Sequence, residues 1–387
     1  MTYPSPLAQP PHAIPAAPPV ATMARPLPVP AKSKGRIVLW LAAAVLLVLC
    51  VGLVAYLLTF LGAAASVIAG ILALIPLGMV LLAVRAIDRW EPEPRALLFF
   101  AVAWGAIAAA VLALAVDLAL TLVLGPEGVP GTISAVVQAP IVEEVAKGIG
   151  VFLIFAAARR AFDGPVDGVV YGALVGAGFA FTENILYFAD SLIVGGVGET
   201  AITFFLRGIL SPFAHVMFTA LIGYGLGLAA RAGYSRVAAL GPWTAGLVAG
   251  IVLHALWNGS AVFADFFGLY VTLQVPLFLL FTLGVVLLRR EEARLTRERL
   301  GEYASVGWFS PAEVEMLATG AGRSKAIAWA RTLPGDRSAL MRRFIAEATA
   351  LAAARQRAIS GRDAAASADE RVYLERTTAV REQLLAR

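Results

Sequence analysis

The sequence contains one cysteine, three histidines and few charged residues among its 387 residues. The single Cys50 excludes an intramolecular disulfide, and a lone cysteine in an apolar run usually packs as a small hydrophobe. Charged residues make up 15% of the chain, hydrophobic residues 59%, and the mean hydropathy is +0.80, which excludes an ordinary soluble domain. The net charge of +5 does not indicate nucleic-acid binding, because the bases lie mainly at the ends of apolar runs and in the C-terminal part.

Repeated apolar runs, each long enough to cross a hydrocarbon core of ~30 Å, predict an all-α polytopic membrane protein. The apolar surface of such a protein contacts the lipid bilayer. We expect about eight membrane-spanning helices, at residues 37–60, 63–84, 97–124, 132–158, 167–189, 201–229, 240–262 and 269–288.

Four connections between these runs contain no lysine or arginine: Gly62, 125–131, 190–200 and 263–268. The other connections and the segments at both ends carry the bases, and the two kinds alternate as eight spans require. The positive-inside rule then predicts a multi-pass protein of the cell membrane with both termini in the cytoplasm. Arg207, inside the sixth expected span, is the exception.

The segments outside the spans differ in composition. Residues 1–36 are rich in proline and predict a disordered cytoplasmic tail, whereas residues 37–288 form the expected transmembrane domain. Residues 289–387 are rich in Ala, Arg and Glu and predict a small cytoplasmic helical tail. Within it, Ser310-Pro311-Ala312-Glu313 is typical of a helix start, and further helices are expected from Ser338 to about Ile359 and from Asp369 onward.

Three ionisable residues lie close together in the fourth expected span. Glu143 and Lys147 are four residues apart and Glu144 and Lys147 three apart, so both pairs can meet on one helix surface. Two adjacent glutamates cannot both be ionised cheaply in lipid, so we expect one to pair with Lys147 and the other to suit a general base or acid. The alternative is a structural ion pair that locks helices together.

The next three expected spans each carry further polar residues. Glu183 and Asn184 lie about 100° apart around the fifth, so both can edge one polar cavity. His215 lies in the sixth, and the seventh has His254 and Asn258 on one face. Because ionisable groups at membrane depth need a protected interior and partners, we predict that these groups and the glutamates share one site.

Such a set suits hydrolysis in two ways. In the first, His215, His254 and Glu183 hold a zinc ion, and a further glutamate deprotonates a water. In the second, a glutamate activates water directly while histidine and asparagine donate hydrogen bonds to the developing oxyanion. The zincin motif HExxH is absent.

These motifs resemble those of the PrsW family of bacterial intramembrane proteases. Four motifs occur in that family's order, namely EExxK (Glu143, Glu144, Lys147), FxxxEN (Phe179, Glu183, Asn184), the isolated His215, and HxxxN (His254, Asn258). The acidic, proline-containing loop 88–94 resembles another hallmark. The resemblance covers about residues 40–290 and implies regulated proteolysis, best known in the family as the first cleavage of a membrane-anchored anti-sigma factor.

PrsW proteins are also distantly similar to the CAAX prenyl endopeptidases and bacteriocin-processing enzymes, with the motifs EExxxR, FxxxH and HxxxN/D. This chain has Lys147 one position before the place of their arginine. It has Glu183 and Asn184 where they have histidine. These departures argue against prenyl-protein substrates.

We therefore interpret the chain as an intramembrane endopeptidase that cleaves a single-span membrane protein at or just inside the outer half of the bilayer. Glu143 or Glu144 activates the water, and Lys147 tunes that pair electrostatically. His215, His254 and Asn258 bind zinc or stabilise the oxyanion, and Glu183 with Asn184 completes the site.

Two other functions remain open at this stage. A proton- or ion-coupled transporter also needs buried Glu, Lys and His, and it predicts discontinuous helices and a paired repeat, although we find no clear repeat. A non-catalytic membrane scaffold is the second alternative. The oligomeric state is not predicted by the sequence.

Overall fold

The computed structural model describes residues 36–125, 129–263, 266–360 and 365–386. These residues form helices and contain no strand, so the predicted all-α class is confirmed. The described chain divides into a unit that ends at Val286, here called the membrane unit, and a unit that begins at Leu287, here called the tail unit. The expected tail 1–36 lies outside the described residues except for Arg36.

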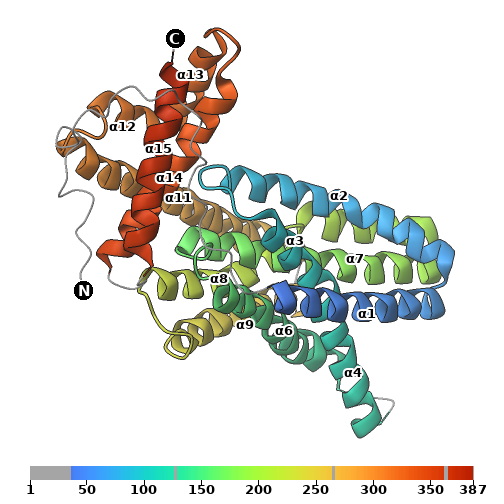
Figure 1. Ribbon diagram of the computed structural model, residues 1–387. Coiled ribbons are helices and arrows are strands. Elements are labelled where there is room, and N and C mark those ends of the chain that lie inside the picture. The colour runs from blue at the N-terminus through green and yellow to red at the C-terminus, as the bar shows by residue number, and fades with distance from the viewer. Residues whose placement is uncertain (1–35, 126–128, 264–265, 361–364, 387) are drawn as a thin grey trace. The chain divides into compact units, whose positions relative to one another are not determined.

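The membrane unit is a bundle of long helices (Figure 1). Several of them pass through a π-helical segment, denoted η. The elements are α1 (Arg36–Phe60), α2 (Ala63–Ile87), α3 (Arg95–Ala103), η3 (Trp104–Ala109), α4 (Ala110–Leu124), α5 (Gly131–Ile133), η4 (Ser134–Gln138), α6 (Ala139–Ala157), α7 (Pro165–Phe204), η5 (Phe205–Leu210), α8 (Ala214–Arg231), α9 (Leu240–Phe263), α10 (Phe266–Leu269), η6 (Tyr270–Gln274) and α11 (Val275–Ser305). α11 continues past Val286 into the tail unit.

Six helical stretches of the described residues are long and apolar enough to cross a membrane, where the sequence predicts about eight spans. The difference has two causes. The expected span 132–158 carries three charged side chains and is not among the six. The expected fifth and sixth spans run together as one stretch, Pro165–Arg231, whose 67 residues far exceed one bilayer thickness at ~1.5 Å per residue.

This long stretch turns back on itself at Gly196. The backbone there has φ 68° and ψ −160°, a conformation that glycine adopts readily because it lacks a Cβ. Beyond Gly196 the chain runs back along the earlier part of α7, so that the ring of Phe204 lies 5.6 Å from that of Phe188. The expected sixth span, 201–229, is not one continuous helix, because residues 211–213 separate η5 from α8 and Pro212 cannot continue the helical hydrogen bonds.

Small residues let α8 pack closely against α7. A Cβ added at Gly176 would lie 2.3 Å from the carbonyl oxygen of His215, and one added at Gly172 would lie 2.5 Å from that of Thr219. Helix backbones approach this closely only where side chains are missing. These two glycines therefore set the position of His215 and Thr219. α6 packs against α7, α8 and α9 around the same region.

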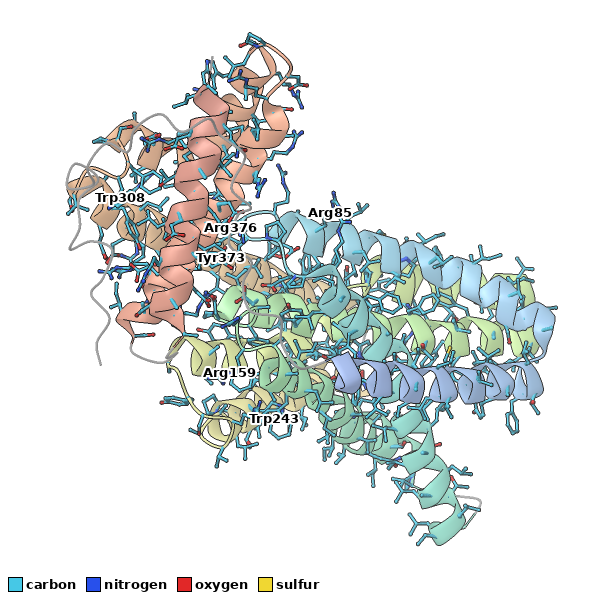
Figure 2. The ribbon with its side chains drawn as sticks, in the orientation of Figure 1. Arg85, Arg159, Trp243, Trp308, Tyr373 and Arg376 are labelled. Atoms are coloured by element: carbon cyan, nitrogen blue, oxygen red, sulfur yellow. The ribbon has the colours of Figure 1, made fainter. Side chains whose placement is uncertain are left out.

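Two of the base-carrying connections meet at one end of the membrane unit. Arg159 Nη2 donates a hydrogen bond to the carbonyl of Tyr234 at 2.7 Å, and Arg236 donates to the carbonyl of Ala156. Figure 2 shows Arg159 and Trp243 at this end. The contact agrees with the alternation of basic and base-free connections seen in the sequence.

The tail unit contains α12 (Pro311–Leu317), α13 (Gly320–Arg331), α14 (Ser338–Ile359) and α15 (Ala366–Leu385) around its own apolar core. The predicted helix start at Ser310 is confirmed: its Oγ accepts from Glu313 N at 3.2 Å, and Glu313 Oε2 accepts from Ser310 N at 2.8 Å. The helices expected from Ser338 and near Asp369 are also present.

Candidate active site

Lys147 stands at the centre of the polar groups in the membrane unit. Its Nζ lies 2.7 Å from Glu144 Oε1, 3.2 Å from Glu143 Oε2 and 3.0 Å from His215 Nδ1. It also lies 4.0 Å from the centroid of the Phe179 ring, a cation–π contact. The lysine side chain is fully buried, and such a charge is tolerated only with partners of this kind.

The adjacent carboxylates of α6 have different surroundings. Glu144 is fully buried and accepts hydrogen bonds from Lys147 and, at 3.0 Å, from Thr219 Oγ1, and its Oε1 lies 3.1 Å from His254 Nδ1. Glu143 keeps 11% of its side chain exposed and lines a cavity of about 270 Å³. Glu144 is therefore saturated by protein partners, whereas Glu143 can reach a molecule in the cavity.

The two histidines come from different helices and meet at this pair. The ring centroids of His215 on α8 and His254 on α9 are 5.0 Å apart. The ring of Phe218 stacks on His254 at 4.6 Å and thereby fixes its plane. The sequence prediction that these histidines approach the glutamates of α6 is in accord with this geometry.

Four of these residues offer donor atoms that a metal ion uses. One ligand atom from each of Glu143, Glu144, His215 and His254 lies within 4.8 Å of the others, and all four residues are buried. Two imidazoles with carboxylates are typical of zinc sites, so the donor set fits the metal in kind and in spacing. The Lys147 ammonium contacts three of these four residues, Glu143, Glu144 and His215, so a metal ion bound there would compete with the ammonium.

Glu183 lies outside that four-residue group, beside Arg207. Its Oε2 lies 2.5 Å from Arg207 Nη2 and 2.7 Å from His215 Nε2. Arg207 Nε also donates to Asn184 Oδ1 at 3.1 Å, and its guanidinium lies 3.8 Å from the centroid of the Tyr187 ring. The fold brings Arg207 here because the chain reverses at Gly196.

Asn258 contacts a different element. Its Nδ2 donates to the carbonyl of Ala135 at 2.9 Å and so joins α9 to η4. The predicted catalytic roles of Asn258 and Asn184 remain predictions. Sequence reasoning did not single out Thr219, although it lies one turn after His215 on the same helix face.

Two tryptophans hold the backbone of α6 on either side of Lys147. Trp104 Nε1 donates to the carbonyl of Ala146, and Trp243 Nε1 donates to that of Gly148, both at 3.0 Å. These bonds fix the axial position and rotation of α6 and hence the direction of the lysine side chain.

The acidic loop that follows α2 packs onto α7. Glu93 is buried, and its Oε2 accepts a hydrogen bond from the Tyr171 hydroxyl at 2.5 Å. Its backbone N–H donates to Asp88 Oδ1 at 3.1 Å. Burial, reinforced by the neighbouring Asp167 carboxylate, raises the pKa of Glu93 to about 11.

Comparison with known proteins bears on this site. Residues 93–281, which include Glu143, Glu144, Lys147, Glu183, His215 and His254, match the family of PrsW intramembrane metalloproteases. The resemblance to the PrsW family is confirmed. Proteins named Protease PrsW are similar to this chain: that of Geobacillus kaustophilus is 38% identical over 109 residues, and that of Bacillus subtilis is 37% identical over 99 residues.

The PrsW similarity is partial in extent. The Geobacillus match covers 28% of this chain and 44% of the relative, and the Bacillus match covers 26% and 39%. The PrsW protease of Oceanobacillus iheyensis is 38% identical over 97 residues, which cover 25% of this chain and 41% of that protein. The chain thus spans less than half the length of the curated relatives it matches. No solved structure matches it.

Proposed function

We propose that this chain is an intramembrane endopeptidase that hydrolyses a peptide bond of a single-span membrane protein. The observation that carries the proposal is the pair of adjacent glutamates on α6, of which Glu144 binds the buried Lys147, His254 and Thr219 while Glu143 lines a cavity. This arrangement suits a hydrolase, because Glu144 fixes the position of Lys147 while the accessible Glu143 carboxylate can act as the general base. The family match supports this reading.

In the proposed reaction Glu143 accepts a proton from a water molecule as the water oxygen bonds to the carbonyl carbon. The carbonyl oxygen gains the negative charge, which the nearby positive charge of the buried Lys147 ammonium stabilises. The same Glu143 proton then passes to the amide nitrogen as the C–N bond breaks. One peptide bond and one water are consumed, and one carboxylic acid and one amine are released.

A zinc ion held by His215, His254 and a carboxylate of the Glu143–Glu144 pair would supply Lewis-acid polarisation of the scissile carbonyl. In either chemistry Glu183 orients His215 from the opposite ring nitrogen, as carboxylates do for ligating or donating histidines. A membrane-anchored anti-sigma factor, the substrate that the resemblance implies, is one protein of this class.

The test uses purified full-length protein in proteoliposomes with a single-span reporter protein. We expect a defined cleavage product from the wild type and none from Glu143→Gln. Metal analysis and a chelator arm run in parallel, since loss of cleavage on chelation and recovery with zinc distinguishes the metal-dependent mechanism. Intact reporter in every arm, with folded protein present, would contradict the protease assignment.

A proton- or ion-coupled transporter is the alternative function. It predicts interrupted helices, and the helical stretch from α7 into η5 is interrupted at Gly196. Proton or ion flux into liposomes that depends on Glu143, without reporter cleavage, would favour it. A scaffold function would survive Glu143→Gln.

We also propose that both termini face the cytoplasm, on the basis of the base-free connections. In a Cys50→Ser background, Gly195→Cys should react with an impermeant reagent from outside intact cells and Ser367→Cys should not. The opposite labelling would invert the topology.

A further inference from the structure

The cavity beside Glu143 has walls from three helices. It lies between α4, the segment from η4 into α6, and α7, and most of its lining is apolar, as at Ala113, Leu114 and Val142. Glu143 and Glu183 line it, and so does Asp117 of α4. The proposed mechanism uses Glu143 as the base and Glu183 to orient His215, but it gives Asp117 no role.

Asp117 is an exposed carboxylate within an otherwise apolar helix. It lies seven residues before α4 ends at Leu124, which corresponds to about 10 Å along the helix axis. Ionisable residues within a membrane span usually face a cavity and serve binding or transport. Gln138 Nε2 donates to Asp117 Oδ1 at 3.3 Å, which ties this carboxylate to the chain segment that leads into Glu143.

The charges of the lining favour a cation. All charged side chains among the described lining residues are carboxylates. Glu143 and Glu183 already pair with Lys147 and Arg207, whereas no basic side chain within the described chain forms an ion pair with Asp117. A carboxylate only accepts hydrogen bonds, so the complementary group must bring donors and positive charge. An ammonium or guanidinium satisfies both requirements.

We propose that this cavity holds the polypeptide segment to be cleaved, and that Asp117 selects substrates with a lysine or arginine side chain near the scissile bond. The inference rests on the proposed function and names its substrate class. The apolar walls accept small or aliphatic residues of the segment, and Asp117 fixes its register by one charge pair, because electrostatic complementarity confers specificity more than affinity.

The test measures binding of labelled single-span peptides to the full-length protein in nanodiscs. Three peptides differ only in Lys, Gln or Glu at one end of the apolar span, with a second series for the other end. In one series the wild type should bind the Lys peptide about fivefold more tightly than the Gln peptide, and the Glu peptide most weakly. The preference should shrink at high salt.

Asp117→Asn should abolish the preference and Asp117→Lys should reverse it. Asp190→Asn is the matched control, because it removes the same charge from an exposed position outside the cavity lining and should leave the preference intact. A preference that persists in Asp117→Asn, or no binding of either Lys peptide, would overturn the inference.

Cleavage of the same peptides separates this inference from the proposed function. Binding that follows Asp117 without any cleavage would contradict the protease assignment and leave the cation-selective cavity standing. Cleavage that depends on Glu143 but on neither the peptide charge nor Asp117 would support the protease assignment and contradict the role of Asp117.

Discussion

His215 Nε2 lies 2.7 Å from Glu183 Oε2, while the other ring nitrogen of His215 faces the Lys147 ammonium at 3.0 Å. An ammonium only donates hydrogen bonds, so Nδ1 must accept and Nε2 must carry the hydrogen that Glu183 receives. The imidazole is thereby held in one tautomer by two helices. Arg207 in turn holds Glu183, so a residue of η5 controls the orientation of a histidine of α8.

Arg207→Met should lower the cleavage rate by about 10- to 100-fold, because loss of a group that orients a ligand or donor usually has that effect. Arg207→Lys should recover part of the rate, since it keeps the charge but not the paired contacts to Glu183 and Asn184. Reporter cleavage by equal amounts of folded protein measures the effect. The exposed Arg85→Met is the control. Equal rates for wild type and Arg207→Met would refute the role.

Glu143→Gln and Glu144→Gln should differ in stability although both stop cleavage. Glu144→Gln weakens the main partner of a fully buried lysine, and breaking a buried pair costs about 3 kcal/mol or more. Glu143→Gln changes a carboxylate that is partly exposed to the cavity, and its cost should be much smaller. Thermal unfolding in detergent compares the two. Equal destabilisation would contradict the division of roles.

Lys147 should compete with a metal ion for the same donors. If zinc binds at Glu143, Glu144, His215 and His254, removing the ammonium in Lys147→Met should tighten zinc binding, measured by calorimetry on the purified protein. His254→Ala in the same background should weaken it sharply. Zinc affinity that is unchanged by Lys147→Met would show that the metal binds elsewhere.

Gly176→Ala should destabilise the membrane unit by about 1–3 kcal/mol, because the added Cβ would collide with the carbonyl of His215 and force α7 and α8 apart. Cleavage should fall as well, since His215 moves with α8. Gly78→Ala in α2 is the matched control: its Cβ meets nothing within 4 Å, and alanine favours the helix by about 1 kcal/mol. The two substitutions should therefore have opposite signs in thermal unfolding.

Glu93 should make stability depend on pH. Its pKa of about 11 in the folded protein lies above the usual 4.5, so the folded state keeps a proton that the unfolded chain releases. This contribution is complete below about pH 4.5 and is lost as pH rises towards 11, by at most about 1.4 kcal/mol per pH unit. Glu93→Gln cannot ionise and should flatten the stability profile between pH 5 and 9. The exposed Glu375→Gln should leave the slope unchanged.

The sequence predicts the membrane class and the convergence of Glu143, Lys147 and His215, because polar groups in apolar helices must find one another. Spacing on a single helix also predicts that Lys147 reaches both glutamates, as observed. The difference between Glu143 and Glu144 is not in the sequence. It depends on Thr219 and His254, which arrive from other helices.

Arg207 shows the other limit of the sequence. It stands out as a base within an apolar run, but its partner depends on the direction the chain takes after Gly196. A glycine permits a reversal without requiring one. Asp117 carries no motif, and its significance depends on the cavity that α4 forms with α6 and α7.

The indole bonds to Ala146 and Gly148 have an optical consequence. Two of the seven tryptophans in the chain are attached to the backbone that flanks the central lysine. Any displacement of α6, by a bound peptide, a metal or a lost charge, must change the hydrogen bonding of these fluorophores. The centre thus contains its own spectroscopic reporters, and Trp104→Phe and Trp243→Phe would assign the signal to one side of Lys147 or the other.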